Sequence, residues 1–402
     1  MNCFKKLYCR SFQTIMKIAI PFMPYRKPNM LDSLKDLPAL LKDKNISSVL
    51  LVTDKGIRGL GLTSGLEKDI TKAGIKLTVF DDVIPNPTIS NIEAGVEVYK
   101  QKNCEAIIAF GGGSVMDCAK IIGARIVKPN QPVKKMKGLL KICKKLPLLI
   151  AVPTTAGTGS ETTLAAVITD DATHHKYPIN DFNLIPQYAV LDYKTTIGLP
   201  PHITSTTGMD ALTHAVEAYI GKSTTRQTRD MSEKAVKLIV ENIEKVYKNG
   251  KDKNARDNML KASFFAGVAF TKSYVGYVHA VAHSLGGKYG VPHGLANAII
   301  LPYFLERYGQ KVVKPLSKLA KISGIADDCD DKKLAADKFV AWIKETNKKL
   351  NIPEYIDSIK KEDIPELAAK ADSEGNPLYP VPRLMDKAEL ADMYYVVGGI
   401  VK

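Results

Sequence analysis

The pattern of apolar and polar residues changes character about halfway along the 402-residue chain. In the first half, short apolar runs rich in β-branched residues alternate with stretches of helical periodicity. We expect buried strands at Val49–Thr53, Lys76–Phe80, Ala106–Phe110 and Leu148–Val152, and crossover helices near 61–73, 88–102 and 114–127. Strands that alternate with helices indicate a parallel sheet, because each crossover returns the chain to the same edge.

From about residue 204 onward, the sequence indicates a succession of helices with few strand signals. The longest periodic segments are Arg229–Lys248, Ala255–Lys272, Asp331–Leu350 and Asp386–Val397. The boundary is expected at Leu199-Pro200-Pro201, because paired prolines stop a helix. The predicted fold is an α/β domain with a Rossmann-like parallel sheet over residues 1–200, followed by an all-α domain over residues 201–402.

The composition is that of a globular chain, with 45% hydrophobic and 25% charged residues. These fractions exclude a disordered or fibrous protein. No apolar run reaches the roughly twenty residues of a membrane span. The six cysteines form no CxxC pair and no disulfide framework, which favours a reducing compartment. We therefore expect a cytoplasmic protein without a membrane partner.

A formal net charge of +15, from 57 basic and 42 acidic residues, raises the alternative of a nucleic-acid-binding protein. The excess is spread along the chain, as on a lysine-rich solvated surface. The densest basic stretch, residues 134–145, contains no aromatic residues on which bases could stack. We therefore expect no nucleic-acid partner.

The first 31 residues contain six basic residues and no acidic one. A basic, acid-free N-terminus resembles a transit peptide, although serine and threonine are few in this segment. The interpretation we favour is an amphipathic N-terminal arm that covers the sheet. The basic residues are Lys5, Lys6, Arg10, Lys17, Arg26 and Lys27.

A glycine-rich loop, Gly111-Gly112-Gly113-Ser114, directly follows a predicted strand and precedes a predicted helix. Glycines allow backbone amides to approach a pyrophosphate, and the helix N-terminus adds the positive end of its dipole. The loop is not a GxGxxG fingerprint, because Met116 occupies the last glycine position. Ser114 and Asp117 also have the spacing of a capping box, so the alternative is that they only start the helix.

A second loop, Pro153–Glu161 (PTTAGTGSE), follows the strand predicted at Leu148–Val152. Its alternative role is again capping, with Thr158 as the N-cap and Glu161 three residues later. Two such loops at the carboxyl edge of one parallel sheet favour a nucleotide site, because doubly wound folds bind nucleotides there. Asp54 follows the first predicted strand and is placed to accept a hydrogen bond from a ribose hydroxyl. A carboxylate at this position favours NAD over NADP.

Four of the seven histidines fall between residues 214 and 293. Asp210 and His214 are four residues apart on a predicted helix, so they share one face. His279 and His283 repeat this spacing, and His293 begins a further predicted helix. One carboxylate and three imidazoles suit Fe²⁺ or Zn²⁺, with a position left open for a substrate oxygen. For any single histidine a hydrogen-bonded core imidazole is the simpler interpretation, but the combination favours a metal site. The histidines assigned no role are His174, His175 and His202.

These segments together resemble the iron-containing (group III) alcohol dehydrogenases, a family with the dehydroquinate synthase-like fold. Its two signatures are matched by Gly208–Tyr219 (GMDALTHAVEAY) and Gly276–Gly294 (GYVHAVAHSLGGKYGVPHG). The motifs GGGSVMD, PTTAGTGSE and VTDKG and the run Pro85-Asn86-Pro87-Thr88 also match, in the expected order. The resemblance extends from about residue 48 to the C-terminus.

The resemblance implies roles for individual residues. It implies that the metal ligands are Asp210, His214, His279 and His293, and that His283 faces the reaction centre without ligating the metal. It implies NAD contacts from Asp54, Asn86, Gly112, Gly113, Ser114, Asp117, Thr154, Thr155, Thr158, Thr163 and Lys176.

Two positions depart from the family pattern. Pro21–Leu31 lacks the glycine-rich element that often precedes the first helix, and Leu191-Asp192-Tyr193 stands where LDP is usual. Neither departure touches the residues implied in the chemistry.

The expected reaction is reversible hydride transfer between a small primary alcohol or diol and NAD, which gives an aldehyde and NADH. A divalent metal is expected to act as Lewis acid. The alternatives on the same fold are glycerol dehydrogenase-like polyol oxidation and dehydroquinate synthase chemistry. The complete GMDALTHAVEAY and VHAVAH…PHG segments favour the alcohol dehydrogenases. We also expect a homo-oligomer, a dimer or larger.

Overall fold

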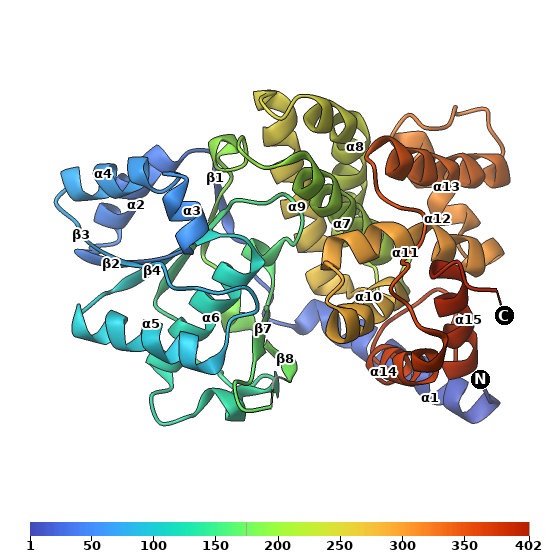
Figure 1. Cartoon of the computed structure of the whole chain (residues 1–402), viewed down its shortest axis with the longest axis horizontal. Coiled ribbons are helices and arrows are strands. Elements are labelled where there is room, and N and C mark those ends of the chain that lie inside the picture. The colour runs from blue at the N-terminus through green and yellow to red at the C-terminus, as the bar shows by residue number, and fades with distance from the viewer. Residues whose placement is uncertain (174, 402) are drawn as a thin grey trace. The chain divides into compact units, whose positions relative to one another are not determined.

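The computed structural model describes residues 1–173 and 175–401, so His174 lies outside the described residues. The chain divides into two compact units (Figure 1). One is Pro24–Gly198, and the other combines Met1–Met23 with Leu199–Lys402. Among the described residues, no helix has both the length and the apolar character needed to span a bilayer. The six cysteines are free thiols.

A six-stranded parallel sheet, in the order β1-β9-β6-β4-β2-β3, lies at the centre of the first unit. Its strands are β1 (Asn29–Leu31), β2 (Ser48–Val52), β3 (Lys76–Phe80), β4 (Ala106–Gly111), β6 (Leu148–Pro153) and β9 (Tyr188–Val190). A smaller sheet of order β5-β8-β7 contains β5 (Gly138–Leu139), β7 (Ala165–Thr169) and β8 (Lys176–Asn180). The predicted strands and their parallel arrangement are confirmed.

Helices cover both faces of the six-stranded sheet because alternate strand residues point to opposite sides. Val49 and Leu51 pack in a core with α2 (Leu37–Asp43) and α4 (Ser64–Lys72). Leu50 packs in a second core with the helices of the other face, α5 (Ile89–Gln101) and α6 (Gly113–Val127). The shorter helices are α3 (Lys55–Gly59) and the 3₁₀ segments η2 (Leu34–Asp36), η3 (Val133–Met136), η4 (Ser160–Thr162), η5 (Phe182–Leu184) and η6 (Tyr193–Thr195).

The second unit is helical, as predicted. Its helices are α1 (Cys3–Ala19), α7 (Pro201–Ile220), α8 (Arg226–Lys248), α9 (Lys253–Ser273), α10 (Tyr277–Tyr289), α11 (His293–Tyr308), α12 (Val313–Ile322), α13 (Lys332–Lys349), α14 (Ile364–Gly375) and α15 (Lys387–Val397). Three 3₁₀ segments complete it: η1 (Ile20–Phe22), η7 (Gly309–Lys311) and η8 (Lys361–Asp363). The prediction that the paired prolines stop a helix is wrong, because Pro200 is the N-cap of α7 and Pro201 its first residue. Proline is favoured there, since the first helical amide has no intrahelical partner.

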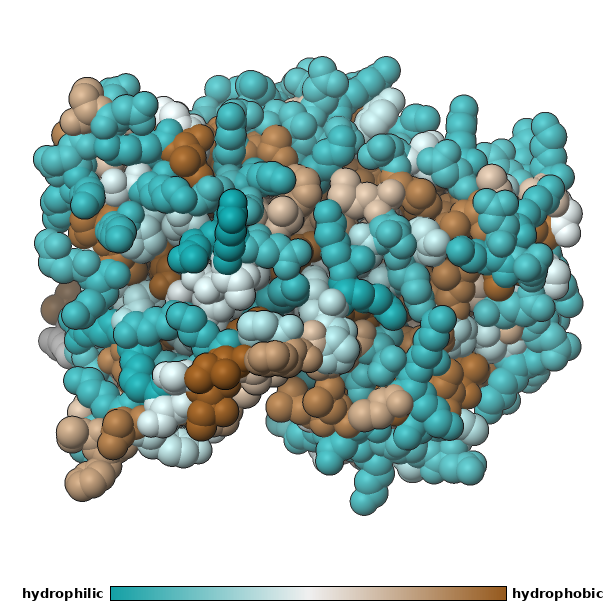
Figure 2. Space-filling view, turned by 180° about the vertical axis from the view of Figure 1, so that it is seen from behind, coloured by the Kyte–Doolittle hydropathy of each residue, from teal (hydrophilic) through white to brown (hydrophobic). Residues whose placement is uncertain are grey.

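Helix α1 belongs to the helical unit, whereas the predicted division placed residues 1–200 together. Its buried residues are Cys9 and Gln13, and Gln13 donates a hydrogen bond to Tyr379 O over 2.7 Å. The expectation that this segment covers the sheet is therefore wrong. Figure 2 shows hydrophilic residues over most of one face of the molecule, in keeping with a dispersed surface charge.

Candidate functional site

Three helices of the helical unit bring the predicted metal ligands together. Helix α7 carries Asp210 and His214, α10 carries His279, and α11 begins at His293. One donor atom from each of these four residues lies within 4.8 Å of those of the other three. The structure therefore assembles one carboxylate and three imidazoles that the sequence supplies in separate segments.

Helix α11 approaches α7 closely because its second residue is glycine. A Cβ atom on Gly294 would lie 2.6 Å from Thr206 O and 3.4 Å from Asp210 Cβ. The first distance is far shorter than a van der Waals contact, so a larger residue would force the two helices apart. Glycine at this position keeps His293 within reach of Asp210, whose Oδ1 lies 3.6 Å from His293 Nε2.

The electrostatic setting of the group keeps the imidazoles of His279 and His293 neutral. Asp210, His214 and His279 are 1%, 4% and 2% exposed. Burial, reinforced by the neighbouring imidazoles, lowers the pKa of His279 well below its usual value. Burial also lowers the pKa of His293 to about 4. Both rings are therefore neutral at pH 7, which is the protonation state in which imidazole binds a metal.

Glu217, to which the sequence analysis assigned no role, orients His279. Its Oε2 lies 2.6 Å from His279 Nδ1 and also accepts from the Gly276 amide at 2.9 Å, while its Oε1 accepts from the Val278 amide at 3.0 Å. Burial raises the pKa of Glu217 to about 7, against the opposing effect of these hydrogen bonds. With Nδ1–H directed at Glu217, the lone pair of His279 Nε2 faces the group. Glu217 could have been found from its spacing, three residues after His214 on the same helix face.

Asn297 is a second residue that the sequence analysis missed. Its Nδ2 lies 2.7 Å from Asp210 Oδ1, 3.2 Å from His279 Nε2 and 3.1 Å from His293 Nε2. Three acceptor atoms from three helices therefore converge on one point. Asn297 lies four residues after His293 on α11, which is again a detectable spacing.

His283 lies beside the four-residue group but is not part of it. Its ring stacks on His293, with 5.1 Å between centroids, and its side chain is 44% exposed. Its Nδ1 lies 2.6 Å from Glu374 Oε1, and the Tyr379 hydroxyl donates to the same oxygen at 2.7 Å. Burial opposes protonation of His283, but the Glu374 carboxylate outweighs it and raises the pKa.

In the α/β unit, the two glycine-rich loops lie side by side. The Thr154 amide donates to Gly111 O over 3.1 Å. A Cβ atom on Gly112 would lie 3.7 Å from the Thr155 side chain, and one on Gly113 would lie 3.4 Å from that of Thr158. The structure thus brings together five of the residues implied in NAD binding, at the start of α6.

The capping alternatives for these loops are wrong. Helix α6 has Gly112 as its N-cap and no side-chain cap, and Ser114 Oγ instead accepts from the Asn86 amide at 3.3 Å. The N-cap of η4 is Gly159, with φ of 59°. Thr158 Oγ1 accepts from the Ser160 amide at 3.3 Å. Ser114 therefore has a tertiary partner, whereas the partner of Thr158 is local but is not the amide that a capping box would use.

Asp117 and Thr163 belong to a buried network beneath the second loop. Asp117 Oδ1 accepts from Ser160 Oγ at 3.0 Å, and its Oδ2 accepts from the Val167 amide at 2.9 Å. The fully buried Lys120 donates to Ser160 Oγ, Thr163 Oγ1 and Ala165 O at 2.8–2.9 Å. Burial lowers the pKa of Lys120 to about 8. This network fixes the loop to α6, and no motif of the sequence indicated Lys120.

The remaining residues implied in NAD binding lie elsewhere in the α/β unit. Asp54 is the N-cap of α3, where its Oδ1 accepts from the Ile57 amide at 2.9 Å. Asn86 has a positive φ of 57° and adjoins Ser114 as described. Lys176 is the exposed first residue of β8.

Two family models match most of the chain. Residues 30–193 match the family described as "Iron-containing alcohol dehydrogenase". Residues 204–396 match "Fe-containing alcohol dehydrogenase family, C-terminal".

The chain is also similar to individual alcohol dehydrogenases, in sequence and in structure. The chain is 37% identical over 343 residues to "Alcohol dehydrogenase 4" of Saccharomyces cerevisiae (strain YJM789), which covers 84% of this chain and 88% of that protein. It is 35% identical to "NAD-dependent methanol dehydrogenase" of Bacillus methanolicus, with coverages of 84% and 89%. The solved structure of a 1,3-propanediol oxidoreductase superposes with a TM-score of 0.87 at 34% identity and covers 92% of this chain and 97% of that one. The chain belongs to the iron-containing alcohol dehydrogenase family.

Proposed function

We propose that this protein is a metal- and NAD-dependent alcohol dehydrogenase that interconverts small primary alcohols or diols with the corresponding aldehydes. The observation that carries the proposal is the buried group of Asp210, His214, His279 and His293. The methanol dehydrogenase relative is NAD-dependent by name, and the structural relative acts on 1,3-propanediol, which supports NAD and a short alcohol or diol.

We propose a division of labour between the two units. The α/β unit, Pro24–Gly198, binds NAD, and the helical unit holds the metal. This assignment follows the predicted roles of residues 1–200 and 201–402, except that helix α1 goes with the metal-binding unit.

The donor set fits a divalent metal such as Fe²⁺ or Zn²⁺. Acceptor atoms of Asp210, His279 and His293 converge on one point, and the depressed pKa values of His279 and His293 keep both rings in the ligating form. When bound, the metal supplies Lewis-acid chemistry that lowers the pKa of the substrate hydroxyl. Glu217 holds His279 in the tautomer that this role requires.

His283 is proposed to receive the proton that leaves the substrate hydroxyl. Its Nδ1 is engaged by Glu374, so Nε2 is the atom available for proton exchange. The partial exposure of the ring gives that proton a route to solvent. An imidazole is suited to this task because its pKa lies near neutrality.

The paired loops of the α/β unit are proposed to hold the dinucleotide. Gly112 and Gly113 expose backbone amides at the N-terminus of α6, where a pyrophosphate is stabilised by the helix dipole. Thr154, Thr155 and Thr158 add hydroxyl groups from the adjoining loop. Asp54 has a second carboxylate oxygen beyond the one that caps α3, and we propose that it accepts from the adenosine ribose.

Reconstitution of the metal-free protein tests the proposal. The protein would be loaded with Fe²⁺ or with Zn²⁺, and oxidation of NADH and of NADPH would be followed with a panel of short aldehydes and alcohols. We expect turnover with NADH only after metal loading, and loss of turnover in His279→Ala and His293→Ala with NAD binding retained. Full activity in a preparation shown to be metal-free by elemental analysis would contradict the proposal.

We also propose a cytoplasmic homo-oligomer. Six free cysteines agree with a reducing compartment. Light scattering coupled to size-exclusion chromatography measures the mass in solution, and a mass of 44.0 kDa would contradict the oligomer.

A further inference from the structure

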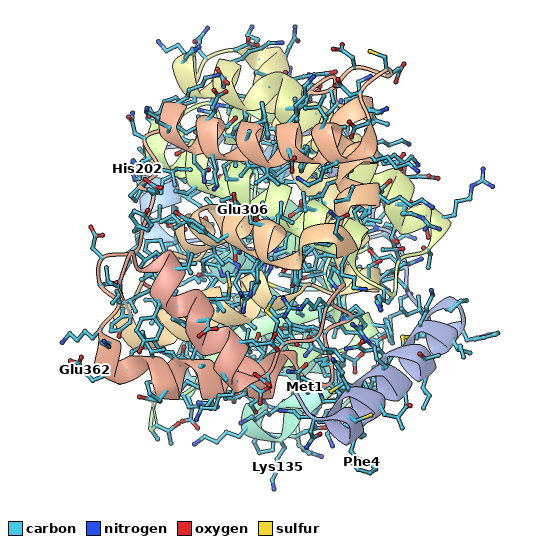
Figure 3. All side chains as sticks on the ribbon, turned by 90° about the vertical axis from the view of Figure 1, so that its right-hand side faces the viewer. Met1, Phe4, Lys135, His202, Glu306 and Glu362 are labelled. Carbon is cyan, nitrogen blue, oxygen red and sulfur yellow. The ribbon has the colours of Figure 1, made fainter. Side chains whose placement is uncertain are left out.

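Helix α1 lies outside the part of the chain that matches the family, since the match begins at residue 30. Its residues Arg10 and Gln13 nevertheless contact one short stretch of the helical unit, the segment Pro377–Pro382, and Lys5 forms an ion pair with Asp372 of α14. Figure 3 shows α1 at the edge of the molecule with the labelled Phe4 projecting outward, where its side chain is 86% exposed. The contacts of α1 with the rest of the helical unit are made from the opposite, inward face.

Two side chains of α1 hold the backbone of Pro377–Pro382. Gln13 Nε2 donates to Tyr379 O at 2.7 Å and to Pro377 O at 3.2 Å. Arg10 donates through Nη1 to Val381 O at 2.8 Å and through Nη2 to Pro382 O at 3.2 Å. Gln13 is 5% exposed, so its donors bind the carbonyl groups away from bulk water.

The same segment carries the support of His283. The Tyr379 hydroxyl donates to Glu374 Oε1, which also accepts from His283 Nδ1. Tyr379 is 8% exposed, and its backbone carbonyl is the one that Gln13 binds most closely. A continuous series of hydrogen bonds and covalent bonds therefore runs from Gln13 through Tyr379 and Glu374 to the imidazole.

We propose that Gln13 and Arg10 are positioning residues for His283, acting through Tyr379 and Glu374. This inference rests on the proposed function, in which His283 takes the substrate proton. A ring that is 44% exposed is not confined by packing alone, so its orientation depends on the Glu374 contact. Loss of the α1 contacts leaves the Tyr379 backbone with only its local hydrogen bonds to Gly375 O and the Val381 amide. The Tyr379 hydroxyl is then held less firmly on Glu374, and the carboxylate rotamer is less well fixed.

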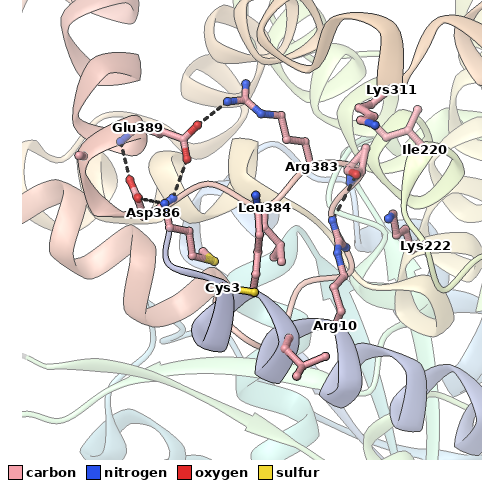
Figure 4. Close-up of a pocket in the computed structure, with 14 residues that line it drawn as sticks. Cys3, Arg10, Ile220, Lys222, Lys311, Arg383, Leu384, Asp386 and Glu389 are labelled. Carbon is pink, nitrogen blue, oxygen red and sulfur yellow. Dashed lines mark hydrogen bonds and ion pairs between the residues drawn. The ribbon is translucent and has the colours of Figure 1, made fainter.

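Arg10 contributes from the wall of a cavity of about 990 Å³, shown in Figure 4. Its guanidinium reaches from α1 across this wall to the carbonyl groups of Val381 and Pro382. Lys6 lines the same cavity from the same helix. No hydrogen bond joins Lys6 to Pro377–Pro382 in the described part of the chain, so it provides a matched control.

The test compares Gln13→Met, which keeps the side-chain length but removes both donors, with Tyr379→Phe, the double variant and Lys6→Gln. All are measured as the full-length, metal-loaded protein after thermal unfolding shows that each is folded. We expect Gln13→Met and Tyr379→Phe each to lower kcat by roughly tenfold or more, with KM for NAD unchanged. The double variant should lose little beyond the worse single variant, because both changes break one series of contacts. Lys6→Gln should behave as wild type.

A second readout does not depend on turnover. Diethyl pyrocarbonate modifies exposed imidazoles, and mass spectrometry of peptides gives the rate for His283 alone. We expect this rate to rise several-fold in Gln13→Met and in Arg10→Met, to be restored in part in Arg10→Lys, and to stay unchanged in Lys6→Gln. Wild-type rates in Gln13→Met and Arg10→Met, or additive losses in the double variant, would overturn the positioning role. A wild-type protein without alcohol turnover would instead refute the proposed function, while the modification rates still decide the positioning role.

Discussion

Glu217 Oε2 and His279 Nδ1 lie 2.6 Å apart in the interior of the helical unit, and the same carboxylate oxygen accepts from the Gly276 amide. One buried carboxylate therefore fixes both the tautomer of an imidazole and the backbone at the start of α10. Space for this arrangement exists because residue 276 is glycine, where a Cβ atom would lie 2.5 Å from Glu217 Oε1.

Replacing Glu217 with glutamine should weaken metal binding while the protein stays folded. The amide has one acceptor oxygen where the carboxylate has two, so either the Val278 amide loses its partner, or the Gly276 amide and His279 Nδ1–H both lose theirs. Loss of such a supporting contact typically lowers metal affinity by roughly 10- to 100-fold. Competition with a chelator of known affinity measures the change for Glu217→Gln. The exposed Glu241→Gln on α8 is the control, and an unchanged affinity in Glu217→Gln would contradict the assigned role.

Asp54 should determine the choice between NAD and NADP. Because Asp54 also caps α3, a glycine substitution would disturb the helix start, whereas Asp54→Asn keeps an acceptor oxygen for the Ile57 amide and removes only the charge. Without the charge, repulsion of a 2′-phosphate disappears. The NAD/NADP ratio of kcat/KM should therefore fall by roughly tenfold or more, which corresponds to about 1.4 kcal/mol. A wild-type preference for NADP would contradict this role.

Glu161 should make the stability of the protein fall as the pH rises from acidic to neutral. It is 1% exposed, neither carboxylate oxygen has a hydrogen-bond partner among the described residues, and burial raises its pKa to about 7. Between the ordinary glutamate pKa and about 7, the folded state binds a proton that the unfolded state has released. Stability contributed by the neutral group is therefore present at low pH and lost as the pH rises through this window.

Glu161→Gln tests this dependence because glutamine stays neutral at every pH. A pKa displacement of this size corresponds to at most about 3 kcal/mol. Between pH 5 and pH 8, wild type should thus lose stability relative to the variant, as measured by the unfolding temperature of the two proteins. The exposed Glu97→Gln should follow wild type. Parallel pH profiles for wild type and Glu161→Gln would show that Glu161 is ionised in the folded protein.

The sequence predicts the parts of the structure that depend on local periodicity. Four strands of the parallel sheet are predicted from short apolar runs that alternate with helical stretches. The placement of Asp210 and His214 on one helix face is predicted from their spacing of four residues. Glu374 escapes prediction because it meets His283 from 91 residues away, through packing of α14 against α10 that no local pattern encodes. Asp117 was predicted in a capping box, but buried tertiary partners satisfy its carboxylate better than the helix start does.

The placement of helix α1 could not be predicted for the same reason, because tertiary contacts and not local periodicity decide where it packs. Its amphipathic pattern does not mark the face that is buried, because Phe4, Leu7, Tyr8, Ile15 and Ile18 are exposed while Cys9 and Gln13 are buried. Polar contacts such as Gln13 with Tyr379 O decide that it packs on the helical unit. Gln13 is buried and Arg10 half-buried on this side of the helix, and polar residues in such positions are the local signal that specific partners exist.

The last prediction separates His283 from the metal ligands, because it shares a face of α10 with His279 and could take a coordination position by spacing alone. Its Nδ1 is engaged by Glu374, and it lies outside the group of four donor residues. Those four already supply the protein ligands of a site that needs one open position for substrate. His283→Ala should therefore retain stoichiometric metal but lose kcat, whereas His279→Ala should lose the metal itself. Elemental analysis of the two purified variants, beside Glu241→Gln as control, decides between these roles: loss of metal in His283→Ala with retention in His279→Ala would reverse the assignment.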